Sequence, residues 1–329
     1  MTRELFLHCI PAFLCTLLLT PLCTGIGWKI GALDIPADGR RMHRLPVPRI
    51  GGLAFFAGFV FAGILSDAFT SLRFSVALGV SGIFLTGLAD DLFNLNAWIK
   101  FSCQTLCASV AVTAQNALSM KEKLFAVFWI VALTNAHNLI DGLDGLLAGT
   151  AVIEGAALGM ALLLTGSGNY LPPFLLAAAV LGFRFYNRAP ATVFAGDCGS
   201  ETVGFLLGIC SLPLLLRPEW GIGFLSAPLI FGYPLTDLLT AVTRRILRGA
   251  PLFGADRAHL HHRLCAAGLD HSRCTRLLNL LCAGIALTGT ALCAERFSVT
   301  ASVCCVSTVF LLLLGRRYVL KRAEEKTPG

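Results

Sequence analysis

The sequence predicts an all-α, polytopic integral membrane protein with about 11 transmembrane helices. Its composition points to the membrane, because 56% of the 329 residues are hydrophobic and only 14% are charged, against about 25% charged residues in soluble domains. The mean hydropathy is accordingly high, at +0.74. Apolar runs of about 20 residues, the length that crosses a bilayer, recur along the whole chain. We therefore expect one polytopic domain over residues 1–329, with any active site built from loops and helix ends.

The apolar runs follow one another closely. Some are short or interrupted by glycine, which leaves a count of about 10 or 11 spans. A cleaved signal peptide is the alternative for the first run, but that run is long and a basic segment follows it, as for a retained first span. The expected spans lie near residues 5–27, 51–67, 74–89, 98–115, 124–139, 143–165, 171–186, 200–216, 222–242, 277–294 and 297–314.

The basic residues set the expected orientation. With an outward N-terminus, 20 of the 26 Lys and Arg residues fall on the cytoplasmic side, as the positive-inside rule requires. The formal net charge of +7 then reflects cytoplasmic loops, and we expect no binding to nucleic acid.

Six aspartates stand at the expected cytoplasmic ends of the spans. A solvated helix end would explain any one of them, but ionisable groups at membrane depth are costly and commonly functional. Their gathering on one face predicts an active site at the cytoplasmic face. The six are Asp90, Asp91, Asp141, Asp144, Asp197 and Asp237.

Two of these aspartates are adjacent, at the end of the third expected span. Neighbouring helical positions point about 100° apart, so Asp90 and Asp91 should face different partners and have different roles. After the fifth span, Asn138 and Asp141 share a helical face, and nearby glycines let the backbone approach a ligand closely. Amide and carboxylate groups of this kind can read a nucleobase edge or a sugar hydroxyl.

A third segment combines Gly196, Asp197 and Ser200 just before the eighth expected span. This order places a hard oxygen ligand beside free backbone N–H groups at a helix N-terminus. The arrangement suits a magnesium ion that bridges to a phosphate.

The long loop after the ninth span carries three close histidines, His259, His261 and His262. A zinc site would need a cysteine or acidic partner at a familiar spacing, and none stands there. Recognition of a phosphate or sugar is favoured. The arginines nearby, such as Arg244 and Arg245, can also serve as topology anchors or contacts to lipid headgroups.

Together these motifs resemble those of the polyprenyl-phosphate N-acetylhexosamine-1-phosphate transferases, polytopic enzymes that begin bacterial cell-envelope glycan synthesis. The His-Leu-His-His form looks like the branch that uses UDP-N-acetylglucosamine or a related UDP-amino sugar for enterobacterial antigen, O-antigen or teichoic acid. The branch that transfers phospho-N-acetylmuramoyl-pentapeptide instead carries three consecutive histidines. Five motifs occur in the family's order: Pro46–Gly52, Asp90–Asp91, Asn138–Asp144, Gly196–Asp197 and His259–His262.

The resemblance implies transfer of an N-acetylhexosamine 1-phosphate, with GlcNAc-1-phosphate as the expected group, from a UDP-sugar to undecaprenyl phosphate in the bacterial inner membrane, releasing UMP. It implies that Asp197 binds Mg²⁺, with Mn²⁺ as the alternative ion. Asp90 or Asp91 would deprotonate the acceptor or hold the metal, in one step or through an aspartyl phosphate. The histidines named above would hold the sugar or diphosphate. Substrate-binding residues by the same resemblance are Arg44, Asn138, Asp141, Asp144, Asn187, Phe194 and Arg257.

Some departures and alternatives stay open. Asn94 stands where some members have aspartate, so it is not expected to bind metal, and Cys198 and Glu201 are unusual for the motif. A membrane transporter is the competing class, since Glu154 lies in the middle of the sixth span, although the other carboxylates cluster at one end. Another UDP-amino sugar, such as an N-acetylated 6-deoxyhexosamine, fits the same motifs. The sequence leaves the glycan pathway and a homodimer undecided.

Overall fold

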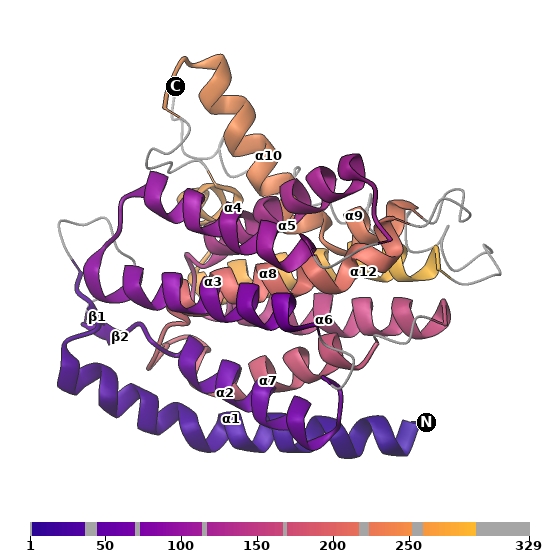
Figure 1. Ribbon diagram of the computed structural model, residues 1–329. Helices are drawn as coiled ribbons and strands as arrows, with labels where there is room; N and C mark the ends of the chain where they lie inside the picture. Colours follow the sequence, from indigo (N-terminus) through magenta and orange to yellow (C-terminus); the bar gives the residue numbers. More distant parts are fainter. Residues whose placement is uncertain are drawn as a thin grey trace.

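The computed structural model describes residues 2–36, 45–69, 73–113, 117–166, 170–216, 224–251 and 259–293. Over these ranges the chain is a bundle of α-helices with one small antiparallel ribbon, in which β1 (Leu33–Asp34) pairs with β2 (Val47–Pro48) (Figure 1). The helices are α1 (Thr2–Ile30), α2 (Gly52–Leu65), α3 (Phe74–Phe93), α4 (Ala97–Thr113), α5 (Met120–Ile140), α6 (Leu146–Leu164), α7 (Leu171–Asn187), α8 (Gly196–Leu215), α9 (Ser226–Ile230), α10 (Gly232–Leu247), α11 (Leu260–Ala266) and α12 (His271–Ala291).

The predicted class of a helical integral membrane protein is confirmed, apart from the two-residue strands of the ribbon. Among the described residues, six helices are long and apolar enough to cross a membrane, and α2 is a shorter apolar helix. The six are α1 (from Glu4), α3, α5, α6, α8 and α12. The expected span at 297–314 lies outside the described residues.

Two of the differences between the predicted spans and the observed helices concern helices that carry predicted site aspartates, Asp237 and Asp197. The span expected at 222–242 is broken at Phe231 into α9 and α10. Pro234 has no N–H to donate to the carbonyl of Ile230, so a continuous α-helix would lose a hydrogen bond and clash there. The second difference is that α8 begins at Gly196, four residues before the expected start, so Asp197 lies in its first turn rather than in a loop.

Local capping fixes where several helices begin and end. Ser119 and Glu122 form a capping box at the start of α5, with Glu122 N donating to Ser119 Oγ over 3.4 Å and Ser119 N to Glu122 Oε2 over 2.7 Å. Asp270 caps α12 by accepting from Arg273 N at 2.8 Å. At the other end of a helix, Asn94 takes the left-handed conformation that terminates α3.

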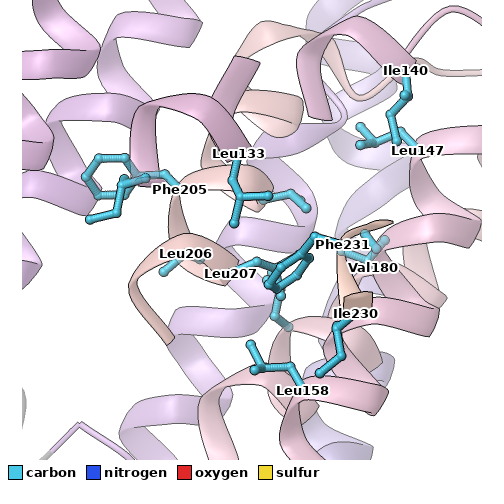
Figure 2. Close-up of a cluster of buried hydrophobic side chains, with 14 of the residues drawn as sticks. Leu133, Ile140, Leu147, Leu158, Val180, Phe205, Leu206, Leu207, Ile230 and Phe231 are labelled. Atoms are coloured by element: carbon cyan, nitrogen blue, oxygen red, sulfur yellow. The ribbon is translucent and has the colours of Figure 1, made fainter. Parts of the chain in front are cut away.

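The central helix is α8. In its 18-residue apolar stretch, 78% of the residues are buried, against 17% in the corresponding stretch of α1. Helix α1 lies along the outside of the bundle, against α2 and α7 (Figure 1). Phe205 and Leu207 of α8 belong to the same buried cluster as Leu133 of α5, Leu158 of α6 and Phe231 (Figure 2). Because lipid tails are as apolar as these side chains, close packing rather than exclusion of water holds the helices together.

Candidate active site

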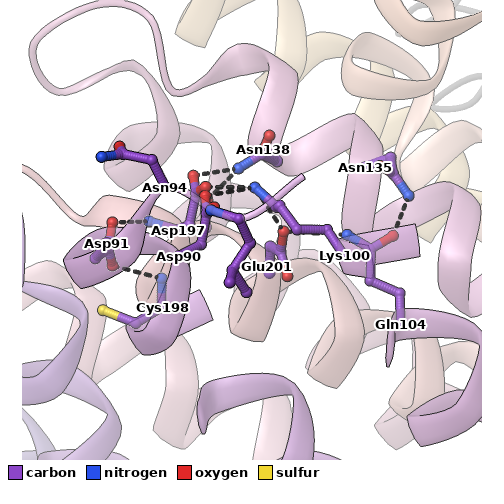
Figure 3. A network of polar contacts seen from close by, with 12 residues as sticks. Asp90, Asp91, Asn94, Lys100, Gln104, Asn135, Asn138, Asp197, Cys198 and Glu201 are labelled. Carbon is purple, nitrogen blue, oxygen red and sulfur yellow. Dashed lines mark hydrogen bonds and ion pairs between the residues drawn. The ribbon is translucent and has the colours of Figure 1, made fainter. Parts of the chain in front are cut away.

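Three carboxylates surround one ammonium where α3, α4 and α8 meet (Figure 3). The Nζ atom of Lys100, in the first turn of α4, lies 2.9 Å from Asp90 Oδ2 and 3.2 Å from Glu201 Oε1, and it contacts Asp197 Oδ2 directly. Asp197 and Glu201 are one helical turn apart on α8, which puts both on the face toward α4. Three acidic groups against one cation leave this cluster with an excess of negative charge.

Asp91 holds the start of α8. Its side chain is only 3% exposed, and its two oxygens accept the backbone N–H groups of Asp197 and Cys198, each at 2.9 Å. These donors have no partner within the helix, and a carboxylate there also interacts favourably with the helix dipole. The expectation that they are free for a phosphate is therefore wrong. The expectation that Asp90 and Asp91 face different partners is confirmed.

Gly196 makes this capping contact sterically feasible. Its φ is +71°, in the left-handed region, and a Cβ there would overlap the carbonyl oxygen of Arg49 and lie 2.6 Å from Asp91 Oδ2. Arg49 in turn donates from Nε to the carbonyl of Asp91 at 3.0 Å and from Nη2 to Asn94 Oδ1 at 2.9 Å. The loop before α2 and the C-terminal end of α3 are thereby tied to the start of α8.

The two predicted binding asparagines have different surroundings. Asn138, in the last turn of α5, donates from Nδ2 to Asp197 Oδ1 at 2.7 Å and to Ser200 Oγ at 3.0 Å. It therefore orients the Asp197 carboxylate (Figure 3). Asn187 is 2% exposed and its amide binds backbone at both ends, with Gly145 N at 3.1 Å and the Val193 carbonyl at 3.0 Å. It supports the turn before α6 and does not line the cavity described next.

A cavity of about 800 Å³ adjoins the carboxylates, within the range of about 300–1,000 Å³ that is usual for small-molecule sites. Phe194 and His262 line it, and Asp144 lines it while accepting from Ala191 N at 2.9 Å. Asp141 also lines it, and burial, with the charges of the aspartates around it, raises the pKa of Asp141 well above the ordinary value. The five aspartates in its wall are Asp34, Asp91, Asp141, Asp144 and Asp197.

The histidine run lies at the same end of the bundle, held by the sixth aspartate. Asp237 of α10 accepts from the backbone N–H of Leu260 at 2.9 Å, and its other oxygen lies 2.8 Å from His259 Nδ1. The ring of His259 stacks on that of His261 at 5.7 Å, and the rings of His261 and His262 are 4.3 Å apart. Asp237 thus fixes the run whose last histidine reaches the cavity.

Both ring nitrogens of His261 are buried, and neither has a hydrogen-bond partner among the described residues. The ring is 1% exposed and fills the space beside Gly142, where a Cβ would lie 2.5 Å from His261 Nε2. Burial and the neighbouring His262 lower the pKa of His261 to about 4, so the ring is neutral at pH 7. Two other predicted residues, Arg44 and Arg257, lie outside the described residues.

Comparison with known proteins identifies the family. The model of "Glycosyl transferase family 4" matches residues 73–214, which carry the carboxylate cluster. A Bacillus subtilis protein named "Probable undecaprenyl-phosphate N-acetylglucosaminyl 1-phosphate transferase" is 36% identical over 83% of this chain and 80% of its own length. The chain belongs to glycosyl transferase family 4. The resemblance seen in the sequence is confirmed.

Other relatives of this family 4 protein carry similar names. The decaprenyl-phosphate N-acetylglucosaminephosphotransferase of Mycobacterium tuberculosis is 33% identical over 84% of this chain and 80% of its own length. The undecaprenyl-phosphate alpha-N-acetylglucosaminyl 1-phosphate transferase of Yersinia pestis is 28% identical over 90% of this chain and 86% of its own length.

Sequence reasoning missed the cation at the centre of the family 4 site. In the sequence, Lys100 is only one of the 20 basic residues on the expected cytoplasmic side, yet in the structure it contacts three carboxylates. Arg49 lies inside a recognised motif but was given no role, and Gln104, which donates to Glu201 Oε1 at 3.1 Å, was not noticed. Lys100 and Gln104 are four residues apart on α4, so a polar face on an otherwise apolar run was the available signal.

Glu154, the residue that favoured a transporter, has a buried partner. Its Oε2 lies 2.7 Å from Nε2 of His137 on α5, and both side chains are 0% exposed. The Nδ1 atom of His137 lies 2.9 Å from the carbonyl of Leu133. Because that carbonyl only accepts, Nδ1 carries a proton, and a second proton must lie between Nε2 and the carboxylate. The pair joins α5 to α6 at no net charge.

We expect the burial of His261 to make the protein less stable in acid. Folding lowers the pKa of His261 from 6.5 to about 4, so the unfolded chain binds a proton at a higher pH than the folded protein does. The contribution to the free energy of unfolding is therefore present above pH 6.5 and is lost as the pH falls toward 4, by on the order of 3 kcal/mol in total. Thermal unfolding in detergent between pH 7 and 4 measures it.

The variant His261→Gln should show a flatter pH profile than the wild type, because its side chain does not titrate. His8→Gln, a substitution far away on α1, is the matched control and should keep the wild-type profile. Identical acid sensitivity in His261→Gln and the wild type would show that another group is responsible.

Proposed function

We propose that this protein transfers N-acetylglucosamine 1-phosphate from UDP-N-acetylglucosamine to undecaprenyl phosphate and releases UMP. The names of its relatives supply the sugar and the polyprenyl phosphate acceptor. The observation that carries the proposal is the carboxylate cluster around Lys100, beside a cavity of about 800 Å³ that Phe194 and His262 line. This puts cation-binding groups next to a space in which a nucleotide sugar fits.

The charges of the substrates call for a cation at this place. A nucleotide diphosphate-sugar and a polyprenyl phosphate are both anions, and two unit charges 4 Å apart repel by about 4 kcal/mol at an effective dielectric constant near 20. The carboxylates of the site add to this repulsion. Lys100 by itself does not balance them.

Asp90 and Asp197 have the chemistry to hold a divalent cation. An ammonium already stands between their Oδ2 atoms, so the pair is arranged around a positive charge. Mg²⁺ is commonly bound by one or two carboxylates together with substrate phosphates. In the described part of the chain, no group of three or more His, Cys, Asp or Glu side chains is placed to hold a metal, and the two carboxylates would leave the other ligand positions to substrate phosphates and water. We propose Mg²⁺, with Mn²⁺ as the alternative, which when bound neutralises the diphosphate.

The remaining work falls to side chains of the protein. The acceptor phosphate oxygen attacks the β-phosphorus in line, and the protein mainly positions the two groups. Asp90 contributes through the proposed metal, because its Oδ2 already contacts a cation, the ammonium of Lys100. Both oxygens of Asp91 accept backbone N–H groups instead. In the cavity, we assign Phe194 to stack on the uracil ring and His262 to contact the diphosphate or sugar.

A direct assay tests this function. Purified protein in detergent should release UMP from UDP-N-acetylglucosamine when undecaprenyl phosphate and magnesium are added, and none when the lipid is omitted. A transporter would release no UMP in either case. UDP-N-acetylgalactosamine and a UDP-N-acetyl-6-deoxyhexosamine, offered in parallel, separate the alternative donors, and faster turnover of either one would replace the donor in the proposal.

We propose that the carboxylate end of the bundle faces the cytoplasm of the bacterial inner membrane, with 11 spans over the whole chain and the N-terminus outside. The support is the placement of charge. Arg49, Lys100, Arg188 and Arg263 lie at or near this end, whereas Lys121 stands at the opposite end of α5 from the site. UDP-sugars are made in the cytoplasm, so an active site that uses them must face the cytoplasm.

We expect two cysteine substitutions to label from opposite sides. Ser272 is exposed and lines the cavity, and Lys121 is exposed at the far end of α5. Ser272→Cys should therefore react with a membrane-impermeant maleimide only in inverted vesicles, and Lys121→Cys only in intact spheroplasts. The parent protein has 13 cysteines of its own, so the measured quantity is the labelling of each variant in excess of the labelling of the parent. Reaction of Ser272→Cys from outside would reverse the proposed topology.

A further inference from the structure

Glu201 is a buried carboxylate to which the proposed transfer mechanism assigns no role. It stands in the second turn of α8, the most enclosed candidate span, and its side chain is 0% exposed. Its Oε1 lies 3.2 Å from Lys100 Nζ and accepts from Gln104 Nε2 at 3.1 Å. Gln104 is held in turn by Asn135 of α5, whose Nδ2 donates to its Oε1 at 2.7 Å (Figure 3). A chain of polar contacts thus fixes this oxygen beside the lysine.

Among the described residues, no partner is found for the second oxygen of Glu201. Its Oε2 is buried and makes no hydrogen bond within the described structure. An unpaired buried acceptor is costly, and an ionised one more so. The ammonium of Lys100 already contacts the other oxygen, Oε1, and divides its contacts among Asp90, Asp197 and Glu201. Glu201 therefore has room for one more contact from this lysine.

Lys100 and a divalent cation compete for the same two oxygens. The ammonium contacts the Oδ2 atoms of Asp90 and Asp197, which are the oxygens assigned above to the metal. A doubly charged ion at these atoms repels the ammonium strongly, because both charges lie in a largely buried place. The lysine must leave the two aspartates when the metal arrives. Glu201 is the third carboxylate that Lys100 contacts. Its Oε2 makes no hydrogen bond within the described residues and could accept one from the ammonium.

We propose that Glu201 is a positioning residue that receives Lys100 when the metal binds. The ammonium moves from Asp90 and Asp197 onto both oxygens of Glu201, so the metal site opens while a positive charge stays beside the diphosphate. No bond is made or broken in this exchange of ion pairs. The inference rests on the metal site of the proposed function.

Binding of Mn²⁺ to the substrate-free protein tests the exchange. Free Mn²⁺ is measured by electron paramagnetic resonance in a titration of the detergent-purified protein. Glu201→Gln should weaken Mn²⁺ binding by roughly 10- to 100-fold, the usual effect of losing a group that supports a metal ligand, because Lys100 then stays on the aspartates. Glu154→Gln is the matched control: it removes an equally buried glutamate that does not contact Lys100, and it should bind Mn²⁺ as the wild type does.

A double variant separates the action through Lys100 from a direct effect on the metal. Lys100→Met should bind Mn²⁺ more tightly than the wild type, and Lys100→Met/Glu201→Gln should match Lys100→Met, since no lysine remains to be moved. Equal weakening by Glu201→Gln in both backgrounds would mean that Glu201 attracts the metal directly, and it overturns the inference. Wild-type affinity in Glu201→Gln also overturns it.

Two further variants complete the test. If Glu201→Gln is not monodisperse, Glu201→Asp takes its place. The shorter side chain keeps the acidic group but moves it away from Lys100, so Mn²⁺ binding should again weaken. Unchanged Mn²⁺ affinity in Glu201→Asp would overturn the inference. Asp197→Asn distinguishes an error in this inference from an error in the proposed metal site. If Asp197→Asn binds Mn²⁺ as the wild type does, the metal site itself is wrong. If only Asp197→Asn loses binding, the metal site stands and the role of Glu201 falls.

Discussion

Asp197→Asn is expected to abolish turnover while the protein stays folded and inserted. The substitution hardly changes the volume, but it removes the charge that faces both Lys100 and the proposed metal, and its amide has one acceptor for the donors of Lys100 and Asn138. A metal ion supplies several kcal/mol of transition-state stabilisation, and about 1.4 kcal/mol is a factor of ten, so the rate of UMP release should fall by about 10³-fold or more.

The matched control is Asp67→Asn, the same chemical change at an exposed position just beyond the far end of α2. It should keep wild-type turnover. Thermal unfolding of both variants in detergent shows whether the fold is intact. Near-normal activity of Asp197→Asn at saturating magnesium would remove Asp197 from the metal site.

Asp91→Asn is expected to lose both stability and activity, whereas Asp90→Asn should lose activity alone. The Asp91 carboxylate accepts two backbone N–H groups at the start of α8, and an amide would turn an NH₂ toward one of them. Charge-assisted hydrogen bonds contribute about 1.5–3 kcal/mol each, so unfolding should become easier by about 3 kcal/mol or more. Asp90 uses Oδ1 to accept from Leu95 N, which an amide oxygen can still do.

The measurements for this pair are the unfolding temperature in detergent and the rate of UMP release. Asp90→Asn should unfold close to the wild-type temperature and still turn over orders of magnitude more slowly, because it lacks one of the two carboxylate charges that hold the proposed metal. Equal and small effects of the two substitutions on both quantities would contradict the division of roles.

Much of the fold could be predicted from residue order because membrane helices must satisfy their own backbone hydrogen bonds and be apolar over a set length. The span expected at 124–139 and α5 (Met120–Ile140) agree to within a few residues for this reason. The break at Phe231 was missed, although Pro234 signals it, because the apolar run continues across it. The early start of α8 was missed because capping by Asp91 comes from another helix.

The candidate site divides in the same way. Motifs that are contiguous in the chain, such as Asp90–Asp91 and His259–His262, could be read directly from the sequence. The partner of each group could not, since Lys100 and Asp197 are 97 residues apart and meet only when α4 packs beside α8. Asn187 had been expected to bind substrate, but its amide binds backbone at both ends, a fact that depends on how the turns around it fold.

The sequence by itself determined the membrane class, the family and the gathering of aspartates at one end of the helices, because hydropathy, motif order and charge are properties of the chain alone. The tertiary structure decided which carboxylate does what. Asp91 caps a helix, Asp90 and Asp197 share an ammonium, and one oxygen of Glu201 makes no hydrogen bond within the described residues. The physical reason is that the state and role of an ionisable group depend on its burial and on the charges within a few ångströms, and these come from distant parts of the chain.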